Sequence, residues 1–150
     1  MQDPFFSPYI YRMNNKKIIR TILAIVIGIV AGIFANSGLI ELSPKIIAPP
    51  ENVDVTTAEG LQSSIHLFQP KHFIMPFLAH ALGTFVGAWV AMKIAQSNEK
   101  KIALFFGVFF LMGGISAVAM IPAPTWFNVL DLTMAYIPMS LLAWYVNGKN

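Results

Sequence analysis

His80 and Asp131 are the side chains in this sequence whose type and setting best suit chemistry, because each stands inside a long apolar run. An ionisable group at membrane depth is energetically expensive and is a functional candidate by default. At the helical rise per residue, His80 lies roughly 10 Å and Asp131 roughly 8 Å below the ends of their runs. We expect these two ends on the same side of a membrane, so the two side chains should lie at matching depth.

Other polar residues fall in the same outer third of the predicted helices. Thr84 shares a helical face with His80, and Asn128 shares one with Asp131. Ser116 lies at a similar depth in a third apolar run, and Glu41 closes the first. The sequence thus predicts a polar pocket open towards the outer face, with these candidate ligand-binding residues: His80, Asp131, Thr84, Ser116, Asn128, Glu41 and Tyr136.

Three interpretations of this pocket stay open. His80 and Asp131 can form a structural hydrogen bond that fixes helix register. They can form a binding site or a proton-linked transport site, since a histidine beside an aspartate responds to protons. They can also serve a hydrolase, with Ser116 as nucleophile, His80 as base and Asp131 as orienter. The sequence has no nucleophile-elbow motif to support the hydrolase.

Metal and thiol chemistry find no support in the sequence. The chain has no cysteine, which excludes disulfides and thiolate metal sites. His66, His72 and His80 are spread over two environments, and no pair of histidines has the i, i+4 spacing of a helical zinc site. We therefore expect no metal and no cofactor.

The elements that must position these residues are membrane-spanning helices. Of the 150 residues, 56% are hydrophobic and only 11% are charged, whereas a soluble domain carries about 25% charged residues. A bilayer is crossed by about 20 apolar residues in helix. The pattern predicts an all-α integral membrane four-helix bundle in a single domain, with spans at about 18–36, 72–95, 102–121 and 125–146.

Lysine and arginine in the short connections predict the orientation. They cluster before span one, between spans two and three, and after span four, so both termini are expected in the cytoplasm of a bacterial-type inner membrane. Residues 37–71 then form a periplasmic loop. Residues 1–12 carry two prolines and are expected to be disordered or not native, with Met13 as the alternative start. A cleaved signal peptide is an alternative for span one.

The 37–71 loop contains one helical pattern. Thr56 and Glu59 have the spacing of a capping box, and Leu61, Ile65 and Phe68 follow at i, i+4 and i+7. These residues predict a short amphipathic helix. It either lies on the outer membrane surface or forms a small lid packed on the helices.

Small residues predict where the long helices touch, because close backbone approach drives helix association in lipid. The stripes are Gly28 and Gly32 in span one and a four-residue repeat from Ala79 to Ala91 in span two. Span three has two, Ala103 with Gly107 and Gly113 with Ala117. Pro138 lies near the middle of span four, removes a backbone hydrogen bond to Met134 and predicts a kink.

The function expected from these features is binding of a small molecule, ion or lipid, with proton-linked transport as an extension that requires an oligomer. The alternative is a structural or accessory subunit of a larger membrane complex, and the remote alternative is the intramembrane hydrolase. The expected partners are the lipid bilayer and either further copies of the chain or other membrane proteins. Nucleic acid is not expected, because no basic patch is interleaved with exposed aromatics.

Overall fold

The computed structural model describes the backbone from residue 8 to residue 148 and the side chains from residue 15 to residue 148. Over this range the chain is helical, with connections between the helices. The elements are α1 (Pro8–Ile46), α2 (Ala58–Ser64), the 3-10 helices η1 (Ile65–Leu67) and η2 (Pro70–Phe73), α3 (Ile74–Ala95), α4 (Glu99–Met120), α5 (Thr125–Met134) and α6 (Ile137–Asn147).

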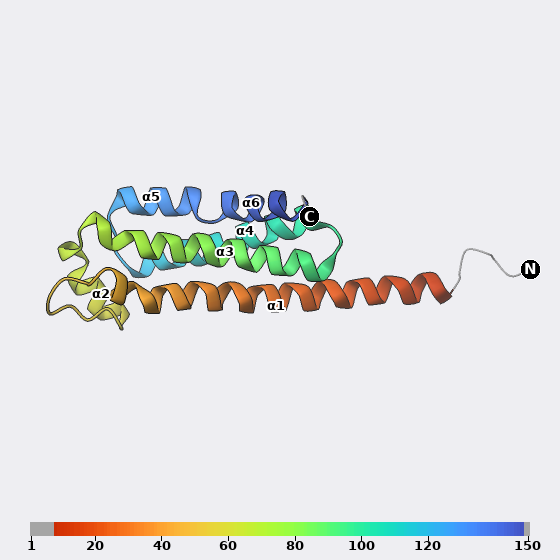
Figure 1. Cartoon of the computed structure of the whole chain (residues 1–150), viewed down its shortest axis with the longest axis horizontal. Coiled ribbons are helices and arrows are strands. Elements are labelled where there is room, and N and C mark those ends of the chain that lie inside the picture. The colour runs from red at the N-terminus through yellow and green to blue at the C-terminus, as the bar shows by residue number, and fades with distance from the viewer. Residues whose placement is uncertain (1–7, 149–150) are drawn as a thin grey trace, which may run out of the picture.

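Four helical segments are long and apolar enough to cross a membrane, by length and composition: Asn15–Ile46, Pro70–Ala95, Glu99–Met120 and Thr125–Asn147. This finding confirms the all-helical class and the number of long apolar helices. In Figure 1 the N-terminal part of α1 and the end of α6 lie towards one end of the molecule, and α2 lies at the other. We call these the basic end, which carries Arg20, Lys93 and Lys100, and the loop end.

Helix α1 is longer than the predicted span. The sequence pattern placed the start of the 37–71 loop directly after span one, but α1 continues to Ile46 with Pro44 inside it. Pro44 lacks the N–H that would donate to the carbonyl of Ile40, but only two residues of α1 follow it. The amide of Ile47 donates to the carbonyl of Ser43 at 2.9 Å and closes the last turn. The irregular chain therefore begins about ten residues later than the sequence suggested.

The N-terminal prediction is covered only in part. Residues 8–12, which we expected to be irregular or not native, belong to α1. Residues 1–7 lie outside the described part of the chain.

Helices α1 and α3 pack through glycines. A Cβ atom built on Gly28 would lie 2.6 Å from the carbonyl oxygen of Gly87, and one on Gly32 would lie 2.7 Å from that of Gly83. Neither space can hold a side chain, so the two backbones meet directly. The predicted contact stripes of spans one and two are confirmed here.

Towards the basic end the helices enclose an apolar core. It comprises Ala24 of α1, four small or flexible residues of α3, three residues of α4 and Ala143 of α6. Phe106 and Met92 are its largest members, and both are fully buried. At the edge of this core the Arg20 side chain donates to the carbonyl of Ile94 at 2.6 Å and so satisfies a group at the end of α3.

At the loop end, α2 and η1 form the predicted short helix. We call residues Ala58–Leu67 the lid. Its N-cap is Thr57, whose hydroxyl accepts from the amide of Gly60 at 3.1 Å. The predicted cap, Thr56, is wrong by one residue, because Thr56 instead donates to the Asp54 carboxylate. The side chain of Gln62 donates to the carbonyl of Met120 and ties the lid to the end of α4.

The fourth apolar segment is broken where Pro138 predicts it. Helix α5 ends at Met134 and α6 begins at Ile137, with Pro138 in its first turn. Tyr136 lies between them with φ −114° and ψ −82°, outside helical geometry. The break gives Tyr136 a direction that a continuous helix would not allow.

Candidate functional site

His80 of α3 and Asp131 of α5 meet, as their matching depths predicted. The Nδ1 atom of His80 lies 2.9 Å from each carboxylate oxygen of Asp131. The Asp131 side chain is 3% exposed and that of His80 is 23% exposed. The carboxylate is thus enclosed by the helices, while part of the imidazole ring remains accessible.

Tyr136 completes the arrangement around Asp131. Its hydroxyl donates to Asp131 Oδ2 at 2.9 Å, and its ring stacks on that of His80 with centroids 5.8 Å apart. In a regular helix, residues five apart point about 140° away from each other. The break before Pro138 turns the tyrosine back onto the carboxylate, so the proline acts on the site through Tyr136.

Gly114 of α4 makes room for this tyrosine. A Cβ atom built on Gly114 would overlap the hydroxyl oxygen of Tyr136. The neighbouring Gly113 has no atom within 4 Å of its built Cβ. The sequence stripe assigned the helix contact to Gly113, and that assignment is wrong by one residue.

The positions of the protons in the His80–Asp131 pair determine which hydrogen bond the second ring nitrogen of His80 can make to a ligand. A buried charge is strongly unfavourable unless it is compensated. Two arrangements leave the pair without net charge: an imidazolium facing a carboxylate, or a neutral imidazole accepting the proton of a carboxylic acid at Nδ1. In both, the other ring nitrogen, Nε2, carries a hydrogen. A neutral imidazole that donates from Nδ1 to the carboxylate leaves Nε2 as an acceptor instead. In each arrangement Nε2 is the ring nitrogen left for a ligand.

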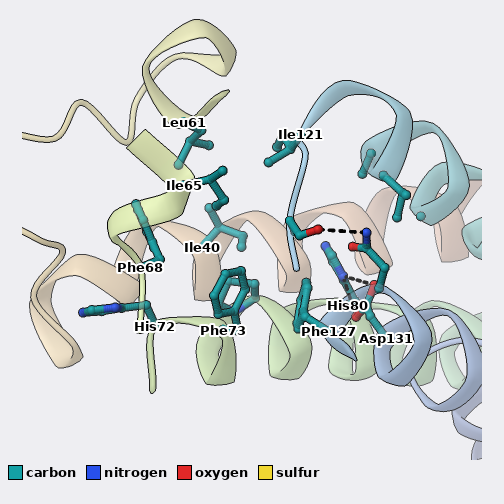
Figure 2. A pocket seen from close by; sticks show the side chains of 16 residues that line it. Ile40, Leu61, Ile65, Phe68, His72, Phe73, His80, Ile121, Phe127 and Asp131 are labelled. Atoms are coloured by element: carbon teal, nitrogen blue, oxygen red, sulfur yellow. Dashed lines mark hydrogen bonds and ion pairs between the residues drawn. The ribbon is translucent and has the colours of Figure 1, made fainter. Parts of the chain in front are cut away.

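A cavity of about 230 Å³ lies beside His80 at the loop end. Figure 2 shows His80 and Asp131 at one side of it, with Phe127 close to them and the lid residues Leu61 and Ile65 farther away. We call this the apolar cavity, because most of its lining is aliphatic or aromatic. The amphipathic face predicted for the lid faces this cavity, which supports the lid interpretation over a helix lying on the membrane surface.

The second ring nitrogen of His80 is free to meet a ligand. In Figure 2 one ring nitrogen is joined to Asp131, and the other lies on the side away from it. No group in the described part of the chain bonds to Nε2. The structure thus directs one ring nitrogen of His80 towards a largely apolar space.

A second cavity of about 220 Å³ adjoins the first between α1 and α4. We call it the side cleft. It shares His80, Gly114 and Ala117 with the apolar cavity. Its further lining includes Ile33 and Asn36 of α1, Thr84 of α3 and Gly113 of α4.

The side cleft exists because α4 changes from large to small residues along its length. Nearer the basic end, the rings of Phe106 and Phe110 reach the built Cβ positions of Gly28 and Gly32 and fill the space between α1 and α4. Beyond Phe110 the residues of α4 that line the cleft are glycines and an alanine. The gap between the two helices is therefore open only in the loop-end half.

The remaining candidate residues are placed unevenly. Asn128 lines the apolar cavity, and its amide donates to the carbonyl of Ala123 at 3.1 Å. Thr84 is buried beside the side cleft, but its hydroxyl donates to the carbonyl of His80 within α3. It therefore makes no bond to the imidazole ring.

Two candidates are not brought to the pair. Ser116 is exposed, donates to the carbonyl of Met112 at 3.0 Å and lines neither the apolar cavity nor the side cleft. Glu41 is exposed on α1 and also lines neither. The serine, histidine and aspartate of the hydrolase interpretation are not assembled.

Sequence reasoning did not select Asn36 as a candidate. It lines the side cleft one turn after Gly32, and its side chain has no hydrogen-bond partner among the described residues. The signal was available in the spacing, because Gly28, Gly32 and Asn36 share the face of α1 that meets α3. No three histidine, cysteine or acidic residues between 8 and 148 are grouped so as to hold a metal ion.

Comparisons with models of protein families, with curated proteins and with solved structures find no match to this chain. The geometry thus defines the class as a helical protein with four segments able to span a membrane. Its candidate site is the imidazole–carboxylate–tyrosine group at the junction of two cavities.

Proposed function

We propose that this chain is a four-helix bundle of a bacterial-type inner membrane, with both termini cytoplasmic, that binds a small and mainly apolar molecule in the apolar cavity. The ligand places an acceptor oxygen, from a carbonyl or hydroxyl group, on Nε2 of His80. Asp131 and Tyr136 are positioning residues that fix the imidazole ring and its proton.

One observation carries this proposal. A histidine whose Nδ1 is held by a buried carboxylate presents its other nitrogen to a cavity of about 230 Å³. A purely structural pair needs no such cavity. Ligand sites in proteins are mostly apolar concavities with a few polar groups that fix orientation, and the apolar cavity has this character.

The basic end supports the proposed orientation. Lys93 lies over the Trp89 ring at 5.6 Å and Lys100 over the Trp144 ring at 5.4 Å. Lysines and tryptophans at one end of apolar helices are typical of a membrane interface, and excess lysine and arginine favour the cytoplasmic side. The loop end and its cavity then face the periplasm.

Binding is favoured over conduction through one chain. The basic-end half is filled by a core in which Phe106 and Met92 are fully buried. A ligand held beside His80 is blocked by this core on its basic-end side. Transport would require a second copy of the chain to contribute the rest of a path.

Native mass spectrometry of the protein extracted in mild detergent tests the proposal. The wild type is expected to carry one small molecule per chain. His80→Leu should lower its occupancy by about tenfold or more, as expected for the loss of a buried hydrogen bond. The matched control is His66→Leu, which removes an exposed lid histidine that lines neither the apolar cavity nor the side cleft.

A second variant guards against simple unfolding. His80→Leu combined with Asp131→Leu removes both members of the pair and leaves no unpaired charge, so the fold should persist while the ligand is lost. A bare wild-type monomer, or one bound only to another protein, would overturn the proposal and favour an accessory subunit. So would full occupancy in the double variant.

A further inference from the structure

We infer that the ligand is a neutral lipid that reaches His80 from within the bilayer, through the side cleft between α1 and α4. This inference rests on the proposed function and specifies its ligand class. The polar end of the lipid, which carries a carbonyl or hydroxyl oxygen, bonds to His80 where the apolar cavity and the side cleft join. Its hydrocarbon chain leaves through the side cleft.

The first support is the position of the cleft along α1. Ile33 lines the cleft and is 50% exposed. It lies 13 residues after Arg20, which is about 20 Å along the helix. The hydrocarbon layer is about 30 Å thick. If Arg20 marks its cytoplasmic boundary, the rim of the cleft opens into hydrocarbon and not into water.

The second support is the separation of α1 from α4. Helix α1 packs along α3, with its closest approach at the glycine pairs. Opposite the cleft, Gly113 of α4 is exposed and has open space around its built Cβ. A chain of methylene groups can therefore pass between Ile33 and Gly113 without displacing a side chain of α4.

The third support concerns the charge of the ligand. The apolar cavity and the side cleft contain one ionisable pair, His80 with Asp131, and that pair is compensated internally. His72 lines the apolar cavity at its far side, where its Nδ1 accepts from the amide of Gln69. Among the side chains that the structure describes, no lysine or arginine lines either space. A phosphate or carboxylate head would be buried without a counter-charge, so an uncharged polar end fits.

A loop-end route is the competing path. A smaller cavity of about 140 Å³ shares Leu61, Phe68 and His72 with the apolar cavity and extends to Pro49 and Val55 in the connection before the lid. A water-soluble ligand would use this route. The two routes predict different effects of chain length and of blocking the cleft.

Photolabelling in phosphatidylcholine vesicles separates the routes. The probes are a long-chain alcohol with a diazirine on its chain and a short, water-soluble alcohol with the same group. The long-chain alcohol is expected to label α1 and α4 around Ile33 and Gly113. This labelling should fall by about tenfold in His80→Leu with Asp131→Leu, since one buried hydrogen bond is lost.

Blocking the cleft provides the matched comparison. Gly113→Trp places a ring at the rim in open space, so the fold should be kept while His80-dependent labelling is lost. Gly38→Trp makes the same change on α1, where the built Cβ also has no neighbour within 4 Å and no cavity is lined. Its labelling should equal that of the wild type.

The outcomes distinguish the two proposals. If the short alcohol labels the apolar cavity in a His80-dependent way and Gly113→Trp changes nothing, the bilayer route is wrong and the binding site stands. If neither alcohol gives His80-dependent labelling, the lipid inference falls. Native mass spectrometry then decides the binding site separately, because it detects any ligand that the wild type carries and His80→Leu loses.

Discussion

The two halves of this molecule use the same pair of helices, α1 and α4, in opposite ways. In the basic-end half, the space between α1 and α4 is filled by the rings of Phe106 and Phe110, which pack against the glycines of α1. In the loop-end half, Gly113 and Gly114 occupy the corresponding face of α4, and the space becomes the side cleft and the apolar cavity.

The difference shows how a small membrane protein can combine a tightly packed half, which holds the helices together, with a half that contains a ligand site. Tight packing of small residues supplies helix association where lipid provides no hydrophobic drive. Because the basic-end half provides this association, the loop-end half can hold the His80–Asp131 pair beside the apolar cavity and the side cleft. Variants that damage only one half should therefore have separable effects on stability and on ligand binding.

The largest effect is expected from removing one partner of the buried pair. His80→Leu leaves the Asp131 carboxylate with only the Tyr136 hydroxyl as a partner. Breaking a buried ion pair on one side costs about 3 kcal/mol or more of unfolding free energy. Unfolding in mixed micelles measures this loss.

The double variant His80→Leu with Asp131→Leu is the control for that measurement. It removes the charge as well as its partner, so it should regain most of the stability. A single variant as stable as the wild type would contradict the enclosed, unpaired carboxylate that the geometry implies.

The next effect tests the packed half. Gly28→Val introduces a side chain where the built Cβ already lies 2.6 Å from the Gly87 carbonyl oxygen and 2.7 Å from Ala91 and Phe106. Overpacking of this kind costs about 2 kcal/mol, and backbone contacts cannot yield as side chains can. Ligand occupancy per folded chain should stay at the wild-type level, because Gly28 lies outside both cavities.

Gly38→Val makes the same change in helix propensity on α1, but its built Cβ has no neighbour within 4 Å. The difference in unfolding free energy between the two valine variants therefore measures the contribution of the close contact between α1 and α3 at Gly28. Equal stabilities would show that α1 and α3 do not pack through Gly28.

A smaller and more local effect is expected at the neighbouring glycines of α4. Gly114→Ala forces the Tyr136 hydroxyl away from Asp131, whereas Gly113→Ala adds a methyl group in open space. Alanine in place of glycine favours a helix by about 1 kcal/mol, and a lost hydrogen bond costs about 1 kcal/mol. Gly113→Ala should thus be stabilising, whereas Gly114→Ala should be destabilising by about 1 kcal/mol or more, because overpacking against the buried Tyr136 ring adds to the lost hydrogen bond.

Unfolding free energy and the near-ultraviolet spectrum of Tyr136 would report this pair of variants. If Gly113→Ala perturbs the tyrosine more than Gly114→Ala does, α4 is rotated by about 100° from the orientation described. That result would also remove Gly113 from the rim of the side cleft.

The sequence predicted the depth of side chains along the helices better than the direction in which they point around each helix axis. Hydropathy gave four long apolar helices, and the rise per residue placed His80 and Asp131 at one level, where they meet. Pro138 predicted the break in the fourth segment, since a missing N–H acts wherever the helix would continue.

Direction around each helix was not predictable in the same way. One residue changes it by about 100°, which is why Gly114 and not Gly113 meets Tyr136, and why Ser116 points away from the pair. The cavities depend on these directions in several helices at once. A pattern within one helix cannot show whether its small residues face a partner backbone or an empty space.

The smallest effect is expected outside the spans, at the connection to the lid. Hydrogen bonds from the Thr56 hydroxyl, then from the Thr56 amide and the Thr57 hydroxyl, lower the pKa of Asp54 below its usual value. A carboxyl whose pKa is depressed on folding contributes stability above its unfolded pKa, and this contribution is lost as the pH falls through the lower folded value. The protection of the Thr56 and Gly60 amides against hydrogen exchange, measured relative to their intrinsic exchange rates, should therefore fall at acidic pH in the wild type. In Asp54→Asn this protection should already be lower at neutral pH and show no such acid transition. Ligand occupancy at neutral pH should be retained, because Asp54 anchors the start of the lid without lining the apolar cavity.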